Sequence, residues 1–113
     1  MNDSRPPVCP LPVPADLSGL EQVVIHPDER LPDYLQAMKL ADAIAEENLG
    51  GFGFMLISWY DRDRDFESPQ HASECHQDSA VPGYVDYALS HGSTLKVDIE
   101  DGRFVFFYMS VDL

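Results

Sequence analysis

The sequence predicts a single small α+β domain, and three observations support this class. Residues 31–49 have apolar side chains at three- and four-residue steps, which is the period of an amphipathic helix. Residues 94–99 alternate between apolar and polar and are joined by Asp101-Gly102 to a second apolar segment, which predicts a β-hairpin. The 113 residues, of which 44% are hydrophobic, are enough for one domain with its own core.

The beginning of the chain is predicted to lie outside this domain. Five prolines in the first fourteen residues remove backbone donors, so we expect residues 1–19 to form an extended, proline-rich tail. The folded domain then covers residues 20–113. Its first strand is predicted over residues 21–26, where three β-branched side chains follow one another and Pro27 ends the strand.

Two helices and a second strand are predicted next. The longer helix, residues 31–49, has Pro32 at a favourable first position and glycines after its end. The shorter helix is predicted over residues 82–91. The apolar segment 52–60 predicts a strand with two apolar faces, and strict alternation places Trp59 on the same face as Met55.

A polar segment without an apolar period, residues 61–79, separates this strand from the shorter helix. It contains six acidic residues, two of the four histidines and one of the two cysteines. A connection of about 20 residues without secondary structure is unusual in a compact domain and is often functional. We therefore predict a long polar loop at 61–79.

The hairpin predicted at the end of the chain has one pairing register, and it leaves one apolar face without cover. The turn places Glu100 opposite Arg103, and their opposite charges attract. One face of the last strand is an apolar row beside charged residues, and it requires cover from a helix, the N-terminal tail or a second subunit. The row consists of Val105, Phe107 and Met109.

The predicted order of elements is β-α-β-loop-α-β-β. Strands and helices do not alternate strictly along the chain. We therefore expect a mostly antiparallel or mixed four-stranded sheet with the two helices on one face.

The net charge of −13 limits the classes of partner. It argues against binding nucleic-acid phosphates, which requires a basic surface, and against anionic membranes. An excess of acid is typical of a protein that it keeps soluble and apart from its neighbours. The alternative is a protein partner with a basic surface, toward which the charge would steer association. The sequence has no run of eighteen apolar residues and no secretory signal, so we expect a cytoplasmic protein in which Cys9 and Cys75 are free thiols.

Aromatic and acidic residues at the end of the second strand predict a binding surface. Alternating acids also begin an EF-hand loop, but the sixth position here is Phe66 in place of glycine, so no calcium loop is predicted. One alternative is a solvated strand end whose acids are partly neutralised by Arg62 and Arg64. The other is that the two aromatic side chains belong to the core, because the strand before them is buried. The predicted surface consists of Trp59, Tyr60, Asp61, Asp63 and Asp65.

The histidines and the cysteine of the loop suggest a second kind of site. His71 and Cys75 are four residues apart, so on a helical turn they would reach one zinc ion together with a nearby acid. Cys75 would also act as a nucleophile with His71 or His76 as its base, although Glu74 beside the sulfur opposes the thiolate. The alternative is an ordinary exposed polar loop. The sequence has no CxxC motif, and no cofactor is predicted.

These observations favour a non-enzymatic protein-binding or regulatory module. A homodimer through the last strand is one form that such binding would take. The alternative is a small metal- or thiol-dependent enzyme that uses residues 61–76. A third interpretation is a structural subunit of a larger assembly, because the apolar row of the last strand needs cover.

Overall fold

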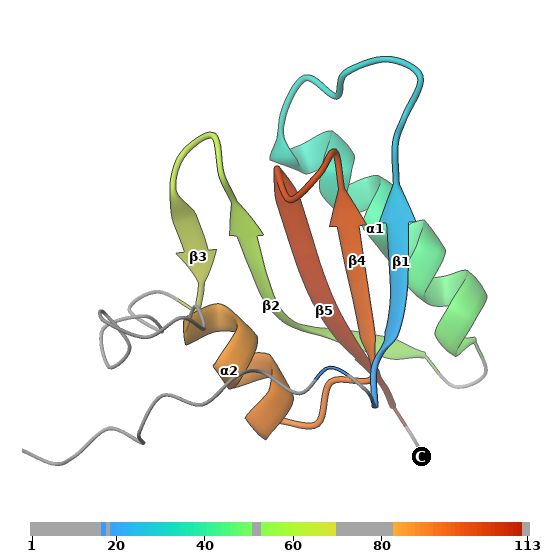
Figure 1. Ribbon diagram of the computed structural model, residues 1–113. Coiled ribbons are helices and arrows are strands. Elements are labelled where there is room, and N and C mark those ends of the chain that lie inside the picture. Colours follow the sequence, from blue (N-terminus) through green and yellow to red (C-terminus); the bar gives the residue numbers. More distant parts are fainter. Residues whose placement is uncertain (1–16, 18, 51–52, 70–82, 112–113) are drawn as a thin grey trace, which may run out of the picture.

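The computed structural model describes residues 17, 19–50, 53–69 and 83–111, which form a five-stranded mixed sheet with a helix on each face (Figure 1). The helices are α1 (Tyr34–Leu49) and α2 (Gly83–Ser90). The strands are β1 (Glu21–Ile25), β2 (Phe54–Asp61), β3 (Phe66–Ser68), β4 (Leu95–Ile99) and β5 (Phe104–Ser110).

The strands lie in the order β1-β4-β5-β2-β3. The β1–β4 pair is parallel and the other pairs are antiparallel. The prediction of an α+β domain with a mixed sheet is confirmed. The sheet has five strands rather than four, because Phe66–Ser68 pair with the end of β2 inside the segment that was predicted to be a loop.

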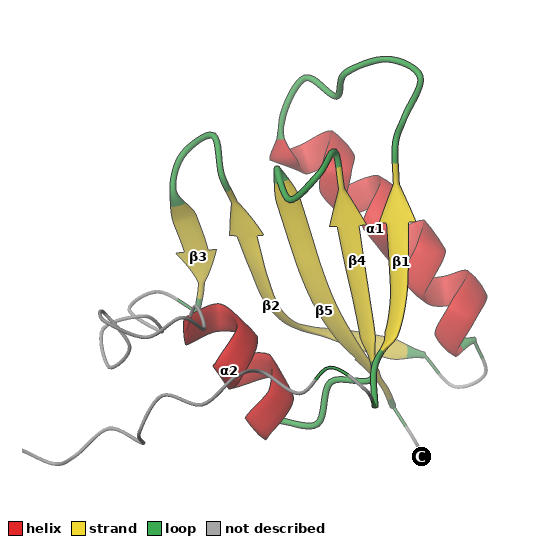
Figure 2. Ribbon diagram, in the orientation of Figure 1, coloured by secondary structure: helices red, strands yellow, loops and turns green. Residues whose placement is uncertain are grey.

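The two helices cover opposite faces of the sheet (Figure 2). The prediction that both lie on one face is wrong, because β5 is apolar on both of its faces and each face needs cover. Phe104, Phe106 and Tyr108 are fully buried in the core under α1. Val105 and Phe107 pack with Tyr84 and Ala88 of α2, so a helix covers two of the three residues of the apolar row.

The buried face of α1 consists of three alanines and Ile44. Ala37, Ala41 and Ala45 are fully buried. The helix begins at Tyr34 rather than near Pro32, because the Asp33 side chain accepts a hydrogen bond from the Gln36 N–H (3.2 Å) and acts as its N-cap. These contacts fix the start of the helix against the sheet.

A bulge in β2 changes which face Trp59 occupies. The register with β5 shifts between Leu56 and Ser58, which adds one residue to β2 and interrupts the alternation of its side chains. Trp59 therefore lies in the α1 core, stacked on Tyr34 with ring centroids 5.4 Å apart. The prediction that Trp59 shares a face with Met55 is wrong for this reason. At the bulge, the Ser58 hydroxyl donates to the Tyr84 carbonyl (2.7 Å) and ties α2 to the sheet.

The hairpin between β4 and β5 confirms the predicted register. Ile99 pairs with Phe104 and Leu95 with Tyr108. The central turn residues Asp101 and Gly102 have φ values of 54° and 83°, as a two-residue hairpin turn requires.

The last strand has neighbours on both sides, β4 and β2. Both of its edges are therefore paired within the sheet, and a homodimer stays a prediction. Within the described residues, neither helix combines the length and the apolar character needed to cross a membrane.

Candidate functional site

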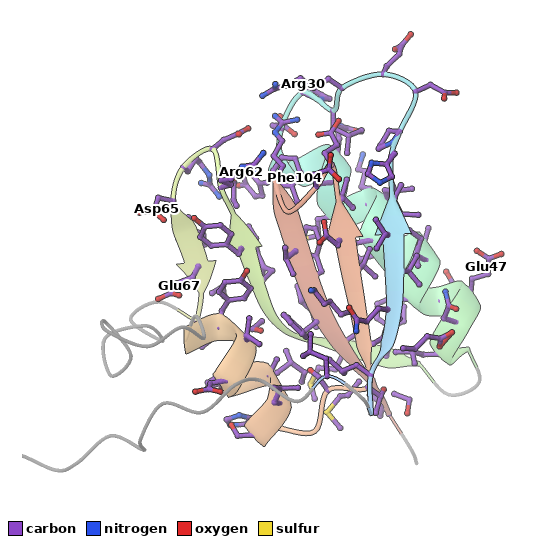
Figure 3. The ribbon with its side chains drawn as sticks, viewed as in Figure 1. Arg30, Glu47, Arg62, Asp65, Glu67 and Phe104 are labelled. Atoms are coloured by element: carbon purple, nitrogen blue, oxygen red, sulfur yellow. The ribbon has the colours of Figure 1, made fainter. Side chains whose placement is uncertain are left out.

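Three loops meet at one end of the sheet, which we call the loop end. They are residues 26–33 between β1 and α1, residues 62–65 between β2 and β3, and residues 100–103 between β4 and β5. Because β1, β2 and β4 run in the same direction, all three strands end at this edge. Figure 3 shows Arg30, Arg62 and Asp65 at this end, whereas Glu47 lies near the other end of α1.

The Arg103 guanidinium joins the three loops. Its side chain is only 5% exposed. It donates from Nε and Nη2 to Asp63 Oδ2 (2.8 and 2.6 Å), and from Nη1 to Glu100 Oε1 (2.6 Å) and the Leu31 carbonyl (2.7 Å). Asp63, Glu100 and Leu31 each belong to a different loop. One buried charge therefore sets the distances between all three.

Glu100 holds the first loop a second time. Its Oε2 accepts a hydrogen bond from the Leu31 N–H (3.0 Å), so its two oxygens bind Leu31 and Arg103. The Glu100 N–H donates to the Ile25 carbonyl at the end of β1 (3.0 Å). Glu100 has a φ of 56°, a conformation that costs roughly 1–2 kcal/mol for a residue other than glycine. We infer that these three hydrogen bonds offset that cost.

Asp61 shapes the loop that carries Asp63. It is 2% exposed and accepts hydrogen bonds from the Asp63 N–H (3.0 Å) and from Arg64 Nε (2.7 Å). The Arg64 guanidinium carbon lies 4.0 Å from the centroid of the Tyr34 ring, which links this loop to the start of α1. Asp61 therefore positions Asp63 for its contact with Arg103.

The charged groups of this network shift one another's pKa values. The hydrogen bond from Arg103 lowers the pKa of Asp63. Burial raises the pKa of Glu100, but the hydrogen bonds from Arg103 and from the Leu31 N–H outweigh it, and the net shift is downward. The hydrogen bond to Asp63 likewise raises the pKa of Arg103. All three groups are held in their charged forms.

A tyrosine pair lies on the α2 face beside the loop end. The rings of Tyr60 and Tyr84 are stacked with centroids 5.1 Å apart, and the Tyr60 hydroxyl donates to Asp65 Oδ1 (2.8 Å). Burial raises the pKa of Tyr84 to about 12. Burial and the contact with Asp65 also raise the pKa of Tyr60. Both phenols are therefore protonated near neutral pH and do not serve as bases there.

The structure places the predicted binding-surface residues in different environments. Trp59 packs in the α1 core, and Asp61 is buried within its own hairpin. Asp63 is 39% exposed and bound to Arg103. Tyr60 is half-buried and Asp65 is exposed, and these two are in contact.

The predicted metal or thiol residues His71, Cys75 and His76 lie outside the described residues. Across the ranges that the structure describes, no three His, Cys, Asp or Glu side chains are grouped to hold a metal ion.

Ser90 and His91 also fail to form a catalytic pair, although the Ser90 hydroxyl is 3.2 Å from His91 Nδ1. That nitrogen lies 2.8 Å from the Tyr87 carbonyl and must carry a proton to bond it, so it does not accept the Ser90 proton.

Sequence reasoning found part of this network. The predicted attraction between Glu100 and Arg103 is confirmed as a contact of 2.6 Å. The contacts of Arg103 with Asp63 and Leu31 were missed, because these partners are 40 and 72 residues away in the chain. The available signal was the position of Arg103 directly before an apolar strand, where a guanidinium is buried and needs acidic partners.

The exposed part of the loop end is acidic. The three loops contain seven acidic residues and four arginines. Arg103 is buried, Arg64 is bound to Asp61, and Arg62 donates to the Asp101 carbonyl (3.2 Å). Arg30 is 4.0 Å from Asp63. The exposed acids that are not bound to these arginines through their side chains are Asp28, Glu29, Asp33, Asp65 and Asp101.

We predict that Arg103→Met lowers the free energy of unfolding by about 2–3 kcal/mol, because it leaves Glu100 largely buried without its charge partner. The loss is moderate for a buried pair because Asp63 is partly exposed and regains water. Urea denaturation measures the change. The control is Arg30→Met, whose side chain is 74% exposed and should matter by less than about 0.5 kcal/mol. Equal losses in the two variants would contradict the prediction.

Stability should also depend on the protonation of the two carboxylates. Because their pKa values are lower in the folded protein, the unfolded chain binds protons first as the pH falls. Their contribution is complete above about pH 5 and is lost as the pH drops through the folded-state pKa values. We expect the free energy of unfolding of the natural protein to fall more steeply between about pH 5 and pH 3 than that of Asp63→Asn/Glu100→Gln. If the free energy of unfolding depends on pH in the same way in both proteins, Asp63 and Glu100 do not cause the loss of stability in acid.

The comparisons with known proteins identify the fold but no activity. A solved structure, that of a novel protein AF1514 from Archeoglobus fulgidus DSM 4304, is similar with a TM-score of 0.66. The similarity covers 82% of this chain and 96% of that protein, at 18% sequence identity. No curated protein matches the chain.

A family model matches most of the domain described above. It spans residues 20–108, from the residue before β1 to within β5, and thus contains the whole loop end. The chain therefore belongs to the family of the domain of unknown function DUF5619.

Proposed function

We propose that the protein is a non-enzymatic binding module of the cytoplasm that docks a protein partner with a basic surface at its loop end. The exposed acids Asp28, Glu29, Asp65 and Asp101 would form the centre of the docking surface. Asp63 would lie at its inner border, since it is partly exposed and bound to Arg103.

The observation that carries the proposal is the set of contacts that the arginines of the loop end make. Arg103 and Arg64 face acidic partners within the domain, and Arg62 bonds a backbone carbonyl. Arg30 and Arg62 are exposed, but the three loops contain seven acidic residues against four arginines, so the charge offered to solvent is still mainly that of carboxylates. A net charge of −13 adds a long-range attraction for basic partners.

The hydrogen bonds that join the three loops support a binding role. Arg103 and Glu100 connect three loops through short hydrogen bonds, so their surface is largely ordered before a partner arrives. A preorganised surface loses less conformational entropy on binding.

The chemistry of the described residues favours binding over catalysis. Asp63, Glu100 and Arg103 hold one another in their charged forms, and Tyr60 and Tyr84 beside them are protonated near neutral pH. General acid–base catalysis needs a group whose pKa lies near the working pH.

Affinity capture tests the proposal with a matched pair of variants. We expect tagged natural protein to retain a basic protein at about 50 mM salt and to release it at about 300 mM, where screening is stronger. Asp28→Asn/Glu29→Gln should weaken retention several-fold. Glu46→Gln/Glu47→Gln removes the same charge from an exposed pair near the other end of α1 and should retain the partner.

Two results would contradict the proposal. The first is that no protein is retained in a salt-dependent way. The second is that both double variants weaken retention equally, which would show that only the total charge matters and not the loop end.

A further inference from the structure

The outer edge of β1 has backbone groups that face away from the sheet. The Glu21 N–H donates to the Thr94 carbonyl (2.9 Å), and the Ile25 carbonyl accepts from the Glu100 N–H (3.0 Å). Backbone groups of alternate residues point to opposite sides of a strand. The N–H and C=O groups of Gln22 and Val24 therefore point outward, and β1 is the terminal strand of the sheet formed by the described residues.

This edge lacks the features that usually prevent a strand from pairing. The five residues of β1 include no proline and no lysine, and its register with β4 is continuous, without a bulge. Val24 is 57% exposed, the highest value among the exposed large hydrophobic residues that the structure describes. The opposite edge differs, because β3 has only three residues.

The charges along this edge favour a basic partner. Residues 21–30 include Glu21, Asp28 and Glu29 and one basic residue that is always charged, Arg30, which lies 4.0 Å from Asp63. Asp98 pairs with Val24 in the neighbouring strand, and its side chain is on the same face of the sheet. Lys96 pairs with Gln22 at the other end of the strand. The negative charge therefore increases toward the end of β1, where the strand enters the loop end.

We propose that an extended, basic segment of the partner adds to β1 as a sixth strand, with its lysine or arginine side chains toward Asp28 and Glu29. This inference rests on the proposed function and names the structural class of its partner. The backbone of Gln22 and Val24 supplies two donors and two acceptors for the added strand. The flanking carboxylates supply the preference for a basic sequence.

Two synthetic peptides of equal charge test the inference at low salt. The first is Lys-Val-Lys-Val-Lys-Val-Lys, which can form a strand. The second has proline in place of each valine, which removes the N–H of alternate residues and favours the polyproline II conformation over a β-strand. We expect the valine peptide to bind at least tenfold more tightly. We also expect it to slow the hydrogen exchange of the Gln22 and Val24 amides, which face outward in the free protein.

A proline in the protein itself gives a second test. Val24→Pro removes only an outward N–H and is compatible with an edge strand, so the fold should be retained and binding of the valine peptide should weaken about tenfold. Val24→Ala keeps the N–H and should weaken binding less. Circular dichroism and a thermal melt check that both variants are folded. If Val24→Pro is unfolded, hydrogen exchange in the natural protein replaces this test: strand addition requires that the valine peptide protects the Gln22 and Val24 amides.

The possible outcomes separate the two proposals. If both peptides bind equally and the Gln22 and Val24 amides gain no protection, strand addition is overturned but acidic docking stands. If neither peptide binds at low salt, strand addition is overturned and the proposed function fails with it. Preferred binding of the valine peptide with protection of both amides supports the inference.

Discussion

A buried guanidinium is the constraint on which the arrangement of the loop end depends. Arg103 reaches this position because it lies between the β4–β5 turn and a strand that is apolar on both faces. A charge that is 95% removed from solvent must be paired, and its partners come from three separate loops. Ion pairs of this kind add little net stability compared with apolar packing, but they specify geometry. We infer that the role of Arg103 is to define where the loops lie.

The architecture around it follows from the apolar character of β5. With Phe104, Phe106 and Tyr108 on one face and Val105 and Phe107 on the other, this strand belongs at the centre of the sheet and needs a helix on each side. The centre of the sheet then consists of packing residues. The exposed polar chemistry lies at the loops and at the outer strands, which is why both proposals concern these regions.

Local patterns predicted much of the fold, whereas the candidate site depends on distant contacts. The helix at 31–49 and the hairpin around Asp101-Gly102 were predictable because their signals, apolar period and turn chemistry, lie within a few residues. The face of the sheet on which Trp59 lies could not be predicted, because the sequence of an apolar strand does not show where a bulge occurs. The position of Asp63 beside Arg103 depends on the order of strands, which no short segment encodes.

Hydrogen exchange of Arg103→Lys tests the central claim most directly. Lysine keeps the charge but lacks the fork of donors that reaches three partners at once. If Arg103 joins the loops, the Leu31 and Asp63 amides should exchange faster together, although both lie far from the substitution in sequence, while the amides of β4 and β5 keep their protection. Faster exchange confined to residues 100–103 would contradict the claim and would show that the three loops are ordered independently.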